Sequence, residues 1–183
     1  MSIPPSNLDR TIRRRHSREW AMQMLFALDL APLEGALDDF FAGFWDQQRE
    51  IVQDLGSDPD AALRSFDGEA ARPHRVFAEA LVEGVLQHLG EIDARLESLN
   101  DGWPLQRMGG VDRNVLRVAL YEMLYLGDTP PAVIINEAVD IAKYYSTRES
   151  GRFVNGMLDR VAKGLDKPLR FQAKDPGFSG RRA

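Results

Sequence analysis

Five arginines are crowded near the start of the chain. They stand at positions 10, 13, 14, 15 and 18, with His16 among them and no acid between the first and the last. A guanidinium group keeps its charge and offers a planar fork of donors that matches phosphate oxygens. It can also stack on an exposed base. The cluster therefore predicts a binding site for a phosphate-bearing polymer, and a short arginine-rich segment favours RNA over duplex DNA.

Two other interpretations of the arginine cluster compete with RNA binding. The first is a solubilising helix start that pairs with an acidic body, since the chain has a net charge of −5 and ten acids between Glu34 and Glu69. Cations at a helix start oppose the helix dipole, which argues mildly for a functional role. The second is an electrostatic membrane anchor, which the scarcity of bulky apolar residues beside the cluster disfavours.

Little in the sequence could carry catalysis. The histidines at positions 16, 74 and 88 fall in different predicted elements and lack the spacing of metal ligands, and the chain has no cysteine. Neither a P-loop nor the GxGxxG and GxSxG motifs occur. Neighbouring acids such as Asp38 and Asp39 are typical of a solvated helix face. We therefore expect no enzymatic activity, no bound metal and no cofactor.

Length and composition indicate one globular domain. The chain has 183 residues, of which 44% are apolar, and this is enough for a sizeable core. No apolar run approaches the roughly 20 residues of a membrane span, and the first residues lack the apolar stretch of a secretory signal. The absence of cysteine suits a reducing compartment. We expect a cytoplasmic protein that does not enter membranes.

Apolar residues recur at helical spacing through most of the chain, and no segment shows the alternation of a strand. Pro32 and Pro73 suit the first turns of helices, Asp112 suits an N-cap, and Ser146 with Glu149 has the spacing of a capping box. The pattern predicts an all-α fold of six or seven helices on one core. We expect the helices over about 8–30, 32–55, 73–99, 112–126, 132–145 and from 146 onward.

Composition also divides the chain. Residues 1–12 are expected to form a flexible arm, 13–166 a single helical domain, and 167–183 a flexible tail rich in polar residues, glycine and proline. Within the domain, the segment near 31–75 is unusually acidic and contains a predicted loop over 58–72. It could lengthen the second helix and add a loop.

Four segments of the chain read as motifs. They are RRHSREWAMQMLF (14–26), VLRVALYEM (115–123), PAVIINEAV (131–139) and FVNGML (153–158). Together, and in this order, they resemble the NusB family of transcription antitermination factors. The resemblance implies two packed helical bundles that form one domain. It also implies binding of the single-stranded boxA element of nascent ribosomal RNA, jointly with the small-subunit ribosomal protein NusE, so that RNA polymerase resists termination. A homodimer would be compatible with such a protein. The segment near 31–75 is longer and more acidic than the resemblance implies, which could alter dimerisation or partner docking.

The resemblance assigns roles to individual residues. Arg14, Arg15 and Arg18 correspond to the arginine-rich RNA-binding motif of the family. Further RNA contacts are expected where the last two helices meet, from Lys143, Arg152 and Phe153, with Glu149 tuning affinity. The ribosomal-protein partner is expected to meet Phe26 and Asp112.

Several of these residues have a competing structural interpretation. Phe153 could be a core residue rather than a base-stacking one, and Asp112 could be only a helix cap. We expect structural roles for Asn136, Asn155 and Gly156: the asparagines as buried hydrogen-bonding groups, and the glycine as a point of close helix contact.

Two alternatives to an RNA-binding antitermination factor remain at this point. NusB-like domains also occur fused to RNA methyltransferases, but a methyltransferase needs a second, doubly wound domain, for which this chain has no room. The other alternative is a protein–protein adaptor whose arginine cluster meets an acidic partner. Salt dependence and competition by RNA would separate this adaptor from the RNA-binding protein.

Overall fold

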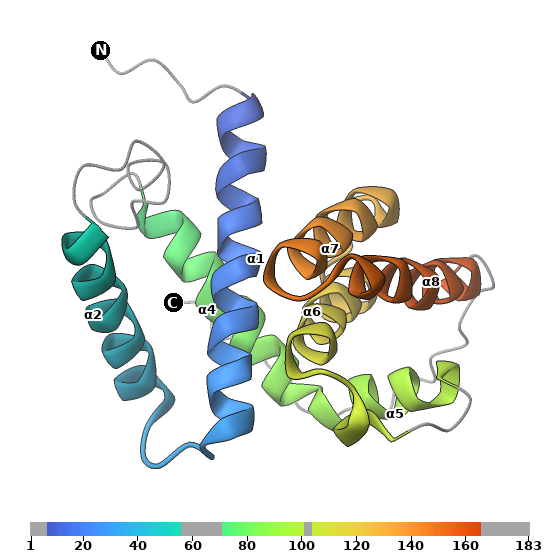
Figure 1. Ribbon diagram of the computed structural model, residues 1–183, viewed down its shortest axis with the longest axis horizontal. Coiled ribbons are helices and arrows are strands. Elements are labelled where there is room, and N and C mark those ends of the chain that lie inside the picture. Colours follow the sequence, from blue (N-terminus) through green and yellow to red (C-terminus); the bar gives the residue numbers. More distant parts are fainter. Residues whose placement is uncertain (1–6, 56–70, 101–103, 166–183) are drawn as a thin grey trace, which may run out of the picture.

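The computed structural model describes residues 7–55, 71–100 and 104–165, which are almost entirely helical (Figure 1). In these ranges there are seven α-helices, a 3₁₀ turn and a π turn, and no strand. The α-helices are α1 (Asn7–Leu30), α2 (Leu37–Leu55), α4 (Arg72–Gln87), α5 (Leu89–Leu99), α6 (Gly110–Tyr121), α7 (Pro131–Tyr145) and α8 (Arg148–Leu165). The 3₁₀ turn η1 (Leu105–Arg107) precedes α6 and the π turn η2 (Glu122–Leu126) follows it. The predicted all-α class is confirmed.

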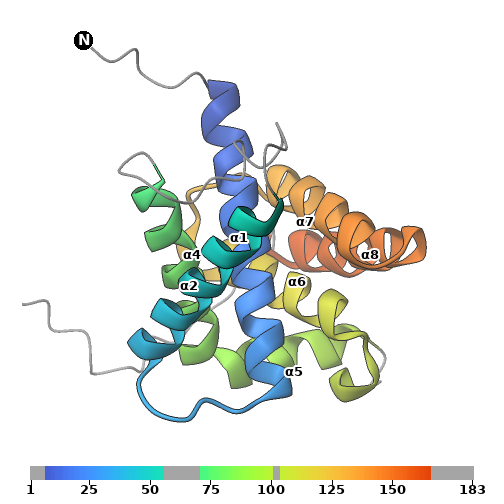
Figure 2. The same ribbon diagram turned by 60° about the vertical axis from the view of Figure 1, so that its left-hand side comes forward.

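Helix α1 separates two groups of helices. Figure 1 and Figure 2 show α2 on one side of it and α6, α7 and α8 on the other, while α4 crosses behind it and also packs against α6. Helix α6 is the centre of the second group, because it packs against α1, α4, α5, α7 and α8. Its residues from Asn114 to Leu120 are accordingly all buried. The apolar core continues from this helix in both directions, through Met24 of α1, Leu81 of α4 and Leu158 of α8.

A network of charged side chains joins the end of α1 to α5 and α6. Asp29 accepts hydrogen bonds from Arg113 at 2.7 Å, from Asn114 at 2.9 Å and from Arg117 at 2.9 Å. Arg117 also donates to Asp93 of α5 at 2.7 Å. Burial, the largest single effect, would raise the pKa of Asp29, but the bonds from its partners together outweigh it and lower that pKa. The network therefore fixes the angle between α1 and the helices under it.

The structure corrects the expected boundaries at three places. Helix α1 begins at Asn7, so residues 7–12, assigned above to a flexible arm, are helical. Pro32 does not start a helix: α2 begins at Leu37, with Asp38 and Asp39 in its first turn, where acids favour the helix dipole. The helix expected over 73–99 is two helices, α4 and α5, which meet at His88. The tail expected over 167–183 and most of the loop expected over 58–72 lie outside the described residues.

Both predicted helix caps are displaced. Asp112 is not an N-cap, because α6 begins at Gly110 and Asp112 lies within its first turn. At the start of α8, the Thr147 hydroxyl accepts the Ser150 backbone N–H at 3.1 Å, so the cap is Thr147 and the Ser146–Glu149 box is not formed. At the end of η2, Gly127 has a left-handed φ of 66° and donates its N–H to the Glu122 carbonyl at 3.2 Å, which ends the turn.

Candidate nucleic-acid interface

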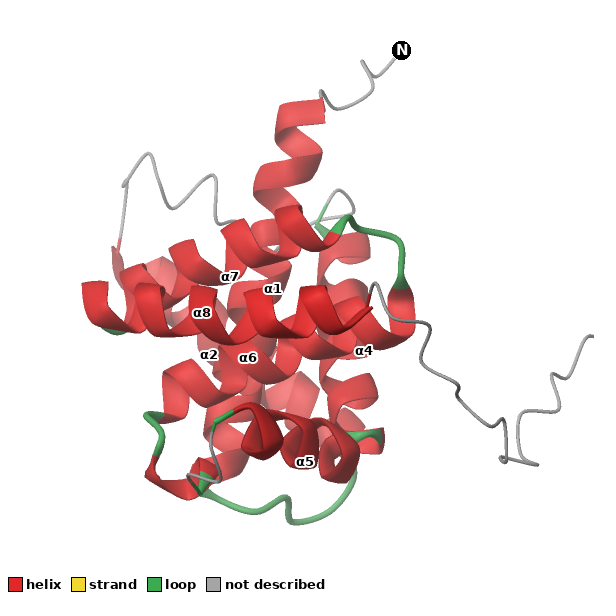
Figure 3. Cartoon of the chain, turned by 90° about the vertical axis from the view of Figure 1, so that its right-hand side faces the viewer, coloured by secondary structure: helices red, strands yellow, loops and turns green. Residues whose placement is uncertain are grey.

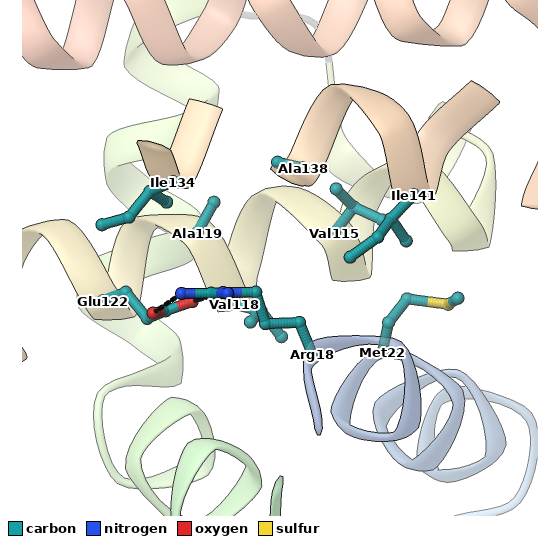
Figure 4. A pocket seen from close by; sticks show the side chains of 9 residues that line it. All are labelled: Arg18, Met22, Val115, Val118, Ala119, Glu122, Ile134, Ala138 and Ile141. Carbon is teal, nitrogen blue, oxygen red and sulfur yellow. Dashed lines mark hydrogen bonds and ion pairs between the residues drawn. The ribbon is translucent and has the colours of Figure 1, made fainter. Parts of the chain in front are cut away.

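Arg18 is buried, unlike the other described arginines of the cluster. Only 4% of it is exposed, and Glu122 of η2 is 2% exposed. The guanidinium of Arg18 donates from Nε to Glu122 Oε1 at 2.6 Å and from Nη2 to Oε2 at 2.8 Å (Figure 4). This two-bonded geometry uses the fork of donors that a phosphate would need. The prediction that Arg18 contacts RNA phosphate is therefore not supported by its position.

The surroundings of the Arg18–Glu122 pair are apolar. The pair borders a small cavity between α1, α6 and α7, and the other side chains around it are hydrophobic (Figure 4). They are Met22, Val115, Val118, Ala119, Ile134, Ala138 and Ile141. A buried ion pair needs good geometry to offset the loss of solvation, and this pair has it. Arg18 thus holds α1 against α6.

Arg15 and Lys143 converge on one carboxylate. Arg15 Nη1 lies 3.4 Å from Asp140 Oδ2, and Lys143 Nζ lies 3.9 Å from Asp140 Oδ1. Arg15 also contacts Glu19 at 3.5 Å. The side chains of Arg15 and Lys143 are 33% and 50% exposed, so both cations reach solvent. Asp140 of α7 thereby brings a cation of α1 beside a cation of α7.

The start of α8 adjoins this pair of cations. A Cβ on Gly151 would lie 2.6 Å from Lys143 Cγ, so the lysine stem packs over the glycine. Arg152 follows in the sequence and is exposed. Figure 3 shows α7 and α8 side by side next to the N-terminal half of α1. Arg15 and Lys143 therefore lie on one surface, which we call the basic face, and Arg152 is an exposed cation next in sequence to the glycine that Lys143 covers. Glu149, in the first turn of α8, is exposed near it.

Arg14 points to a different flank of α1. Its Nη1 donates to Thr129 Oγ1 at 3.3 Å, and its guanidinium lies 5.2 Å from the centre of the Phe77 ring. Consecutive helical residues are about 100° apart, which explains why Arg14 and Arg15 diverge. Arg14 is exposed and lies beside the turn before α7. The side chains of Arg10 and Arg13 lie outside those that the structure describes.

Phe153 is not brought together with the basic residues. It is half-buried and packs against the core. Two residues on the same flank of α8 lie against α5: Arg160 donates to the Leu99 carbonyl at 2.6 Å, and Gly164 lies near Arg95. This flank is opposite the one that Lys143 covers, so the interpretation of Phe153 as a packing residue is favoured.

Phe26 and Asp112 lie close together at the far end of α1. A Cβ on Gly110 would lie 2.7 Å from Phe26 Cε2, so the ring rests on the start of α6, two residues before Asp112. Both residues are half-buried. The buried Oδ1 of Asp112 has no hydrogen-bond partner among the described residues. The two predicted partner contacts thus share one surface.

The motif residues Asn136, Asn155 and Gly156 do not have the structural roles expected of them. Both asparagines are exposed. Gly156 is also exposed, and a Cβ added to it would meet nothing within 4 Å. Neither a buried hydrogen bond nor a close helix contact accounts for these residues. All three residues instead lie on the solvent-exposed surfaces of α7 and α8.

The sequence analysis did not assign three residues to the site that the structure places there: Asp140, Tyr144 and Glu137. Once Ala138 and Ile141 are placed inward, the spacing of α7 turns Asp140 and Tyr144 outward, and this signal was available. The position of Glu137 was not predictable, because it depends on how α1 crosses α7. Burial raises the pKa of Glu137, and the opposing charges of Arg18 and Arg15 only partly offset this.

The described part of the chain offers little else that could act on a substrate. It contains no cluster of three side chains suited to hold a metal ion. None of its helices combines the length and apolar character of a membrane span. What the fold and this surface define is a small helical protein with an exposed basic face.

The chain belongs to the NusB family, whose family model matches residues 15–163. The transcription antitermination protein NusB of Desulfitobacterium hafniense is 42% identical over 154 residues, 84% of this chain and 90% of that protein. Among solved structures, T. maritima NusB is 34% identical with a TM-score of 0.60 and covers 82% of this chain and 90% of its own. The antitermination factors NusB and NusE in complex with dsRNA give a chain that is 26% identical, with a TM-score of 0.61, covering 83% of this chain and 97% of that one.

Proposed function

We propose that the protein is a transcription antitermination factor that binds the boxA element of nascent ribosomal RNA together with the ribosomal protein NusE. One observation carries the proposal: Arg15 of α1 and Lys143 of α7 converge on Asp140 and both reach solvent, and the neighbouring start of α8 carries the exposed Arg152. The relatives named above are antitermination proteins, and one of them is solved with NusE and dsRNA.

In this proposal the protein works by assembly and not by catalysis. Arg15, Lys143 and Arg152 bind successive phosphates of a single strand, and Arg14 extends the track at its edge. Arg18 contributes indirectly, because its ion pair with Glu122 fixes the helix that presents Arg14 and Arg15.

The second surface serves the protein partner. Phe26 and Asp112 form the NusE contact at the opposite end of α1, so RNA and partner do not compete for the same residues. The factor reaches RNA polymerase through the assembled complex. Such a factor acts where transcription occurs, in the bacterial cytoplasm.

The decisive experiment measures binding to a single-stranded boxA RNA and to a scrambled RNA, with and without NusE, over a salt series. We expect the boxA RNA to bind more tightly and NusE to increase its affinity. Each single-strand phosphate contact contributes about −0.7 to the log–log salt slope. The double variant R15A/K143A should therefore flatten the slope by about 1.4.

R49A is the matched control. Arg49 lies on α2, across α1 from the basic face, and its side chain is 41% exposed, close to the 33% of Arg15. This variant should leave the slope unchanged. Equal weak binding of both RNAs, with a slope that R15A/K143A does not alter, would reject the proposal and leave the protein–protein adaptor as the better account.

A further inference from the structure

Tyr144 presents an aromatic ring to solvent beside the basic face. It is 64% exposed, and it is the only aromatic residue among the exposed large hydrophobics of the described ranges. A single exposed apolar side chain is ordinary on a protein surface and needs no explanation alone. The position of this ring among charged neighbours is what gives it significance.

The ring of Tyr144 packs against the ring of Tyr145. Its centre lies 4.8 Å from that of Tyr145, with 72° between the ring planes, an edge-to-face arrangement. The Tyr145 hydroxyl in turn accepts a hydrogen bond from Gln23 of α1 at 3.2 Å. Tyr144 also stands in the last turn of α7, a rigid element. A ring held in this way loses little conformational entropy when a ligand settles on it.

The cations of the basic face lie next to this ring. Tyr144 follows Lys143 directly and lies one helical turn beyond Asp140, on whose carboxylate Arg15 and Lys143 converge. Residues four apart on a helix are neighbours on its surface. An aromatic platform is therefore placed within one helical turn of two solvent-reaching cations from different helices.

We propose that an unpaired RNA base stacks on Tyr144 while phosphates of the same strand bind Arg15 and Lys143. Stacking platforms beside a basic track are the general means by which proteins hold single-stranded nucleic acid. This inference rests on the proposed function and adds the residue that would distinguish an unpaired strand from a duplex, because the bases of a duplex are already stacked on one another. It also replaces Phe153, which packs against the core, as the base-stacking residue.

The test compares Y144A, Y144L and Y144F with the unchanged protein in binding to the single-stranded boxA RNA. Y144A and Y144L should weaken binding about five- to 100-fold, since alanine has no side chain to stack and leucine keeps apolar bulk without an aromatic face. Y144F keeps the ring and should bind like the unchanged protein. The salt slope should be the same in all four proteins, because no charge is removed.

The same variants are also tested for binding to duplex RNA and to NusE. Y144A should change neither the affinity for a duplex of the same sequence nor the binding of NusE. Thermal unfolding of the variants should match that of the unchanged protein, because the ring is exposed.

The outcomes separate this inference from the proposed function. Should the unchanged protein bind RNA with a salt slope that depends on Arg15 and Lys143, while Y144A binds equally well, the stacking role is rejected and RNA binding stands. Loss of NusE binding alone in Y144A would assign the ring to a protein contact and also overturn the inference. Failure of the unchanged protein to bind RNA at all would remove both.

Discussion

Arg18 and Glu122 form an ion pair with two hydrogen bonds in the interior, although 104 positions separate them in the sequence. One comes from the basic motif in α1 and the other from the motif that ends in the π turn η2. The ion pair therefore gives a structural reason for two motif residues, and this reason does not require that either of them binds a ligand. It also ties the helix that carries Arg14 and Arg15 to the centre of the fold.

Replacing Arg18 by alanine should damage folding and not the salt dependence of RNA binding. R18A leaves the Glu122 carboxylate buried without its partner, which costs about 3–5 kcal/mol of the free energy of unfolding. Urea unfolding measures this loss, and the salt slope of the folded protein should not change.

The double variant R18M/E122M is the control for R18A. It replaces the ion pair by apolar side chains beside an apolar cavity and should recover most of the lost stability. A stable R18A whose slope falls by about 0.7 would instead mean that Arg18 meets a phosphate.

Asp140 lies between Arg15 and Lys143, where the proposed function would place an RNA phosphate. D140N keeps the shape of the side chain and removes its charge, so Arg15 and Lys143 lose their intramolecular anion. Exposed ion pairs are worth about 0.2–1 kcal/mol, so RNA affinity should rise by at most about fivefold. D159N, which breaks a comparable exposed pair with Lys163 at 2.7 Å farther along α8, should have a smaller effect. A decrease in affinity in D140N would show that the carboxylate positions the cations.

Periodicity predicted most of the fold, because every helix of the core carries an apolar stripe. Periodicity did not predict side-chain orientations that depend on contacts between residues far apart in the sequence. Arg18 and Arg15 are three residues apart on one helix. The sequence could not show that Arg18 would face the interior and Arg15 the solvent, because this depends on where α6 and α7 pack. Nor could it show that Asn155 and Gly156 are exposed. Proline correctly predicted a helix start at Pro73 but not at Pro32, because the rule states only what a first turn tolerates.

Two glycines should respond in opposite ways to alanine. A Cβ on Gly84 would overlap the ring of Tyr121, so G84A must displace a ring packed between α4 and α6 and should cost about 1–3 kcal/mol. A Cβ on Gly156 would meet nothing within 4 Å, so G156A should stabilise α8 by about 0.4–1 kcal/mol. Thermal unfolding of both variants tests this contrast. If G156A nevertheless weakens RNA or NusE binding, the outer surface of α8 takes part in the complex.

The Asp29 network should make stability fall in acid. The pKa of Asp29 is lower in the folded protein than in the unfolded chain. Its contribution is therefore complete above the unfolded pKa, near 3.9, and is lost as the pH falls through the folded pKa. D29N should be less stable than the unchanged protein at pH 7, and the difference should shrink in acid. Urea unfolding at a series of pH values measures it. A difference that is constant with pH would mean that hydrogen bonds, and not the charge, carry the effect.

Glu137 should give the opposite pH dependence. Burial raises its pKa, and its Oε2 has no hydrogen-bond partner in the described structure. The folded protein thus holds this proton more tightly than the unfolded chain, so stability is lost as the pH rises from the unfolded pKa, near 4.3, through the folded one. E137Q removes the buried charge and should be more stable than the unchanged protein at pH 7. The gain should vanish as the pH falls below both pKa values, where the native carboxyl is also neutral. E149Q is the matched control, because Glu149 is exposed and its neutralisation should alter stability little. Were E137Q less stable at pH 7, the attraction of Arg15 and Arg18 would outweigh the cost of burying the carboxylate.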